Sequence, residues 1–132
     1  MVELHGWVTI QESCRIDDEE ESIEQIVRKL KEQISGMSGG GGDILDIRYC
    51  NGEPFLTITM FKNRINSDVE EVFEFLEYVC KTAPGSYGMI YMYDDESVKM
   101  PDEFQVFAIR KGKIYPERDR YLSPVRNRIY EE

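Results

Sequence analysis

Histidine and cysteine, the side chains that most often serve as general bases and nucleophiles, are scarce in this sequence. His5 is the only histidine, and Cys14, the nearest of three cysteines, lies nine residues farther along the chain. A thiol nucleophile needs its base within hydrogen-bonding distance, and we expect Cys14 to lie beyond the end of the strand that carries His5. His5 is instead expected to be a partly exposed strand residue with a hydrogen-bonding partner. We predict no catalytic residue and no enzymatic activity.

Metal-binding and phosphate-binding patterns are also missing from the sequence. A single histidine excludes a histidine-based metal cluster. Asp94, Asp95 and Glu96 could offer oxygen ligands, but they lack the Asp-x-Asp-x-Asp-Gly spacing of a calcium loop. The glycine run GMSGGGGD has no Gly-Lys-Ser or Gly-Lys-Thr and leads into a strand, so we interpret it as a flexible link. We predict no metal and no cofactor.

The cysteines and the first residues both favour a cytoplasmic protein. Cys14, Cys50 and Cys80 are odd in number, widely spaced and free of the Cys-x-x-Cys spacing, which favours reduced thiols. The opening residues MVELHGW lack the basic and apolar regions of a signal peptide. The apolar runs are short, such as MIYMY, so we expect no membrane span.

Charge is the most unusual property of the chain. Its 26 acids and 16 lysines or arginines give a net charge of −10. From Arg110 to the C-terminus seven bases accompany four acids, so the first 109 residues carry nine bases and 22 acids, a net charge of −13. Such a surface repels nucleic-acid backbones and attracts basic partners. We therefore expect a basic protein partner and no direct binding of nucleic acid.

Five consecutive acids, Asp17 to Glu21, precede an apolar stripe at helical spacing. Carboxylates are stabilised at a helix start by about 0.3–1 kcal/mol each, because they face unpaired N–H groups and the positive end of the helix dipole. Asp17 or Asp18, each with the glutamate three residues later, also fits a capping box. The pattern predicts a helix from about Asp18 to Ser35.

The remaining elements are predicted from turn residues and apolar spacing. Asn51-Gly52 between ILDIRYC and EPFLTITMF is typical of a type I′ hairpin, and this turn pairs Ile47 with Leu56. The other predicted elements are a strand from Leu4 to Glu12, a helix from Ser67 to Ala83, and strands at Tyr87–Tyr93, Phe104–Arg110 and Lys113–Tyr115. The predicted core-facing stripes are Ile23, Ile26, Val27, Leu30 and Ile34 in the first helix and Val69, Val72, Phe73, Leu76 and Cys80 in the second.

This order of elements predicts an α+β fold. Strand-helix-strand-strand-helix-strand is the ferredoxin-like arrangement, here with one or two extra C-terminal strands and both helices on one face of an antiparallel sheet. The predicted strand order is 5-4-1-3-2. Residues 1–132 are predicted to form a single domain, with an irregular tail from 116 to 132 packed on it.

The opposite face of the predicted sheet carries aromatic side chains, among them Trp7, Phe55 and Phe61. RNA-recognition modules stack bases on such a face. This sequence lacks their aromatic motif and surrounds the face with acids, which argues against that function. The C-terminal tail or a protein partner is expected to cover the aromatic side chains instead.

The stretch HGWVTIQES, from His5 to Ser13, followed by the acidic helix, resembles the N-terminal signature of the immunity protein 7 family. The resemblance extends over essentially the full length in size and element order. It implies a cytoplasmic bacterial inhibitor, encoded beside a polymorphic or contact-dependent toxin, that binds and neutralises the cognate toxin domain. The family contributes no catalytic residues. A toxin that acts on nucleic acid presents a basic cleft, which an acidic protein can occupy.

The loop from Asp94 to Glu103 is the predicted site of partner binding. Two other acidic surfaces compete with it, Asp17 to Glu24 and the outward helix face of Glu70, Glu71, Glu74 and Glu77. Acids on helices have a structural explanation in caps and solvated faces. Loop acids have none of this kind, because no helix dipole stabilises them. Loops also carry binding residues disproportionately often. The candidate partner-binding residues are Asp94, Asp95, Glu96, Asp102 and Glu103, with Trp7 and Phe55 as aromatic anchors.

Other functions stay open on the sequence alone. An acidic adaptor with a basic partner other than a toxin would have the same composition. A small hydrolase or an RNA-recognition-like module has less support, because His5 is solitary and the aromatic motif is missing.

Overall fold

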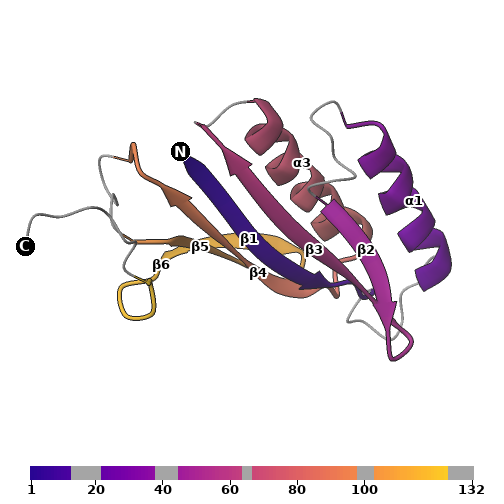
Figure 1. The fold of residues 1–132 in the computed structure, drawn as a ribbon. Helices are drawn as coiled ribbons and strands as arrows, with labels where there is room; N and C mark the ends of the chain where they lie inside the picture. The colour runs from indigo at the N-terminus through magenta and orange to yellow at the C-terminus, as the bar shows by residue number, and fades with distance from the viewer. Residues whose placement is uncertain (13–21, 38–44, 64–66, 98–102, 125–132) are drawn as a thin grey trace, which may run out of the picture.

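A six-stranded antiparallel sheet with both helices on one face forms the body of the molecule (Figure 1). The computed structural model describes residues 1–12, 22–37, 45–63, 67–97 and 103–124. The elements are β1 (Val2–Thr9), α1 (Ile23–Ser35), β2 (Leu45–Cys50), β3 (Glu53–Lys62), α3 (Ser67–Thr82), β4 (Tyr87–Asp94), β5 (Gln105–Arg110) and β6 (Lys113–Arg118). The strand order β2-β3-β1-β4-β5-β6 confirms the predicted order and adds β6 at the edge. The predicted α+β class is confirmed.

The β2–β3 hairpin has the predicted turn and register. Asn51 and Gly52 adopt φ values of 53° and 81°, the left-handed conformations that a type I′ turn requires at both central positions. Ile47 pairs with Leu56 and Tyr49 with Pro54. The apolar residues of both strands therefore face the helices.

The core lies between the sheet and the two helices. Leu30 of α1, Leu56 of β3 and Leu76 of α3 are fully buried within it. The predicted stripe of α1 is confirmed, since all of its members are buried except the partly buried Ile23. In α3, Phe73 is only partly buried, whereas Phe75 and Val79, which the single-stripe prediction omitted, are buried.

The predicted start of α1 is wrong. The helix begins at Ile23, and its N-cap is Ser22. The Gln25 N–H donates to Ser22 Oγ at 3.3 Å, while the Ser22 N–H donates to Gln25 Oε1 at 3.1 Å, which completes a capping box. Neither Asp17 nor Asp18 is therefore the cap, and the acid run of residues 17–21 lies outside the described residues.

Two strand ends also differ from the prediction. β1 spans Val2–Thr9 rather than Leu4 to Glu12, and β6 continues to Arg118 beyond the predicted Tyr115. Pro116 lies within β6. An edge strand tolerates proline because its N–H groups on one side have no ladder partner. Residues 125–132 lie outside the described part of the chain.

Among the described residues, neither helix combines the length and the hydropathy that a transmembrane span requires. Nor do those residues bring three or more histidine, cysteine, aspartate or glutamate side chains together in a way that could hold a metal ion.

Two cysteines in the described residues occupy contrasting environments. Cys50 is exposed beside the hairpin turn, whereas Cys80 is buried on α3. Burial, followed by the nearby Glu77 carboxylate, raises the pKa of the Cys80 thiol above its ordinary value of 9.0. The unfolded chain therefore releases this proton at a lower pH than the folded chain. The stability that the neutral thiol contributes is present below pH 9.0 and is lost as the pH rises through the higher pKa of the folded chain.

We expect iodoacetamide to alkylate Cys50 in the folded protein and to leave Cys80 unmodified, because reaction requires an accessible thiolate. The measurement is the mass of the labelled peptides at pH 8 in a Cys14→Ser background, which leaves these two thiols. The same protein in denaturant serves as the control and should be labelled at both positions. Equal labelling rates in the folded protein would contradict the burial of Cys80.

Candidate partner-binding surfaces

The described part of the predicted acidic site, Asp94, Asp95, Glu96 and Glu103, is here called the acid loop. The carboxylates of three of its members, Asp94, Asp95 and Glu103, have structural partners. Asp95 Oδ1 lies 2.6 Å from the amino group of Met1, and Asp94 Oδ1 accepts a hydrogen bond from the Glu96 N–H at 3.0 Å. Glu103 forms an ion pair with Arg118. The assumption that loop acids have no structural role is therefore wrong, and Asp102 lies outside the described residues.

The acid loop lies at the end of the sheet where β1 begins. Asp94 pairs with Val2, and Val2 pairs with Lys62 on its other side. Lys62 Nζ in turn lies 3.1 Å from Asp68 Oδ2 in the first turn of α3. The acid loop and the acidic start of α3 thus lie at the same end of the molecule.

The predicted aromatic anchors are not next to the acid loop. Trp7 pairs with Met89 of β4, and Phe55 pairs with Thr9 at the far end of β1. Trp7 lies five residues along β1 from Val2, which corresponds to about 17 Å at roughly 3.3 Å per residue. The predicted site residues therefore form two separate surfaces.

The face of the sheet opposite the helices is aromatic, as predicted. Trp7 and Phe61 are 41% and 58% exposed, and Tyr87 lies edge-on to Trp7 with 6.1 Å between ring centroids. Beside the acid loop the face is covered at β4, although Phe61 of β3 remains exposed at the same end of the sheet. The ring of Phe104 lies 5.4 Å from that of Tyr93, which is only 1% exposed.

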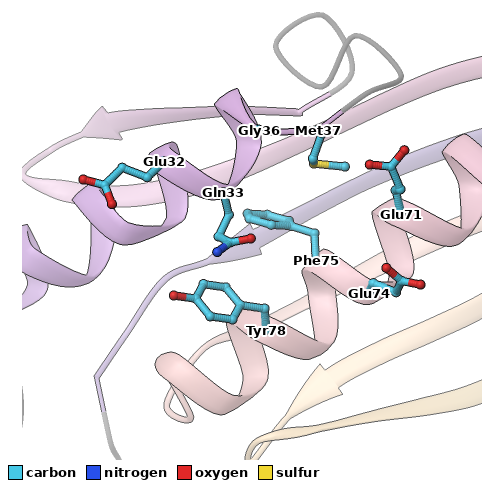
Figure 2. A pocket seen from close by; sticks show the side chains of 8 residues that line it. All are labelled: Glu32, Gln33, Gly36, Met37, Glu71, Glu74, Phe75 and Tyr78. Carbon is cyan, nitrogen blue, oxygen red and sulfur yellow. The ribbon is translucent and has the colours of Figure 1, made fainter.

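A groove with a volume of about 320 Å³ lies between the end of α1 and the middle of α3 (Figure 2). Glu32 lies on the α1 side, and Glu71 and Glu74 lie on the α3 side. The rings of Phe75 and Tyr78 lie between them and point toward α1. The groove is therefore lined by aromatic rings at its base, the aromatic floor, and by glutamates at its edges, the acidic rim.

The comparisons with known proteins assign the family. The family model of Imm7, immunity protein 7, matches residues 1–131. The chain belongs to the immunity protein 7 family. No curated protein and no solved structure matches the chain. Membership confirms the resemblance that the HGWVTIQES stretch carries. It implies a cognate toxin as the partner and neutralisation of that toxin as the role.

Proteins of the immunity protein 7 family are typically non-enzymatic inhibitors. His5 Nε2 lies 3.0 Å from Glu3 Oε1, and its ring lies edge-on to Phe61 with 5.4 Å between centroids. The predicted hydrogen-bonding partner of His5 is thus Glu3. Cys14, the thiol nearest to His5 in sequence, lies outside the described residues.

The inter-helical groove is the feature that the sequence prediction missed. Glu70, Glu71, Glu74 and Glu77 read in sequence as one outward acidic face. In the structure Glu71 and Glu74 share a helical stripe with Phe75 and Tyr78 along the α1 side, because these four residues recur at the i, i+3, i+4, i+7 spacing. This mixed acidic and aromatic stripe is the signal that could have indicated the groove.

Proposed function

We propose that the chain binds and neutralises a cognate toxin domain, specifically a basic nuclease, by blocking its active site or its substrate surface. The family match over residues 1–131 carries the proposal, because an immunity protein implies a toxin partner. The choice of a nuclease is supported by charge. A nuclease cleft must attract phosphate backbones, and a protein body with a net charge of −13 over its first 109 residues complements such a cleft.

We further propose the acid loop, together with Asp102, as a surface that steers the toxin. Asp95 and Glu96 are exposed, and Glu70 in the first turn of α3 adds negative charge at the same end of the molecule, beside the Asp68 that is paired with Lys62. Charges that guide encounter raise association rates by about 10–1,000-fold at low salt. Trp7 and Phe55 are proposed as a separate contact on the open sheet face, with Trp7 exposed enough to anchor a partner.

Replacing Asp94, Asp95 and Glu96 by Asn, Asn and Gln is expected to lower the association rate with the toxin domain by about tenfold at low salt, because steering scales with opposing charge. The salt dependence of that rate should also become flatter. The measurement is binding kinetics across a salt series, with the toxin domain encoded beside this chain, alongside growth protection in cells that express both proteins.

Glu53→Gln is the control for removal of a carboxylate elsewhere, because Glu53 is exposed in the hairpin at the opposite end of the sheet; it removes one negative charge where the triple variant removes three. It should leave the association rate within twofold of wild type, and a melting curve should show that the triple variant remains folded. If the triple variant has the wild-type association rate and the wild-type salt dependence, the acid loop does not steer the toxin. Absence of both binding and protection by the wild-type chain would contradict neutralisation itself.

A further inference from the structure

The groove between α1 and α3 is formed by the end of one helix and the side of another. Gly36 ends α1, and its N–H donates to the carbonyl groups of Glu32 and Gln33. Beside this turn, α3 presents Glu71 and Glu74 along one side of the hollow. Phe75 is buried at the base of the hollow, and Tyr78 is partly buried.

The charged side chains that line the groove are acidic. Within the described part of the chain, the lining includes three glutamates and no lysine, arginine or histidine. The last turn of α1 contains no basic residue, so the negative end of its dipole has no compensating side chain within that turn. The hollow between Glu24, Arg28, Lys31 and Tyr49 differs, because bases of this chain already neutralise part of its acid.

The aromatic floor selects among cations. A guanidinium group is planar, stacks on aromatic faces and donates hydrogen bonds to two carboxylates at once. Glu32 on α1 and Glu74 on α3 supply carboxylates, and Phe75 and Tyr78 supply ring faces. Figure 2 shows the Glu32 carboxylate pointing away from the rings, so this exposed side chain must rotate toward the groove to meet a guanidinium group there. A volume of about 320 Å³ is large enough to admit a guanidinium group with its aliphatic stem.

We propose that this groove binds an arginine side chain of the cognate toxin. The inference rests on the proposed function, since the arginine belongs to the toxin domain. Glu32 and Glu74 pair with the guanidinium group from the two helices, and Tyr78 stacks on its face. Arginine in a basic nuclease contacts phosphate, so its capture here removes a substrate-binding group from the toxin as well as anchoring the complex.

The test separates this contact from charge steering by measuring dissociation. The double variant Glu32→Gln, Glu74→Gln is expected to raise the dissociation rate of the toxin complex by about 10–100-fold, because breaking a desolvated charge pair acts on dissociation. Tyr78→Leu is expected to raise it by about three- to tenfold, since it removes the ring but keeps an apolar side chain. Tyr78→Phe keeps the ring and should restore the wild-type rate.

Glu70→Gln is the matched control, because it removes one carboxylate from the same helix outside the groove lining. It should leave the dissociation rate unchanged. On the toxin, one arginine should prove non-additive with the double variant in a double-mutant cycle. If that arginine can be replaced by lysine without loss, the guanidinium assignment is wrong.

The outcomes distinguish the two proposals. Wild-type dissociation rates in both the double variant and Tyr78→Leu, with binding and protection intact, would overturn the groove while leaving neutralisation in place. A wild-type dimer in solution that the double variant abolishes would mean that a second copy of this chain fills the groove, and would overturn the toxin arginine. A wild-type chain that binds no toxin would overturn both proposals.

Discussion

Leu76→Ala is expected to lower the free energy of unfolding by about 2–5 kcal/mol, because it removes a fully buried side chain and leaves a cavity that its neighbours fill only in part. Leu76 is 0% exposed and lies on the stripe of α3 that belongs to the core. Urea unfolding followed by circular dichroism measures the change as a lower midpoint with an unchanged slope.

Leu122→Ala is the matched control for the same chemical change. The Leu122 side chain is 79% exposed, so its truncation should alter the free energy of unfolding by no more than about 0.5 kcal/mol. A Leu76→Ala variant whose unfolding midpoint equals that of Leu122→Ala would show that α3 does not bury this face.

The parts of the fold that the sequence predicted correctly depend on local chemistry. Asn51-Gly52 specifies a turn whose geometry sets the register of the strands on both sides. The strand order followed from the ferredoxin-like connection pattern. Turn geometry depends on residues that are close in sequence, and strand order depends on rules of chain connection. Neither depends on contacts between distant side chains.

The start of α1 could not be chosen from local chemistry alone. Asp17, Asp18 and Ser22 each stand three residues before a Glu or Gln, so several capping boxes overlap in the sequence. The apolar stripe begins only at Ile23, and packing of that stripe on the sheet selects Ser22 as the cap. The first residue of the apolar stripe, Ile23, is therefore a better indicator of the helix start than the acid run.

The candidate surfaces needed long-range contacts that the sequence does not display. The partner of Asp95 is the amino group of Met1, 94 residues away, and the partner of Glu103 is Arg118. The β1–β4 register determines the distance between Trp7 and the acid loop, and this register is not apparent in the sequence. The groove required the placement of α1 against α3, because Glu32 and Glu74 belong to different helices.

Gly88→Ala is expected to disrupt the β1–β4 pair at the centre of the sheet. Gly88 pairs with Val8, and a Cβ atom at this position would overlap the Trp7 carbonyl oxygen and lie 2.7 Å from Val8 Cα. Both obstacles are backbone atoms, so no side-chain rotation can relieve the overlap. The strands must move apart, at a cost of about 1–3 kcal/mol or more, which thermal unfolding would detect as a lower Tm.

Gly36→Ala tests whether this loss comes from the close approach rather than from any glycine replacement. Gly36 has a φ of −87°, and the nearest atom to an added Cβ, the Gln33 carbonyl oxygen, is 3.6 Å away. Alanine fits this conformation and reduces the freedom of the unfolded chain, so it should leave the stability unchanged or raise it by about 0.4–1 kcal/mol. Equal Tm values for Gly88→Ala and wild type would contradict the close contact between β1 and β4 at Gly88. A lower Tm in Gly88→Ala but not in Gly36→Ala would locate the strain at β1, the strand that carries the HGW stretch.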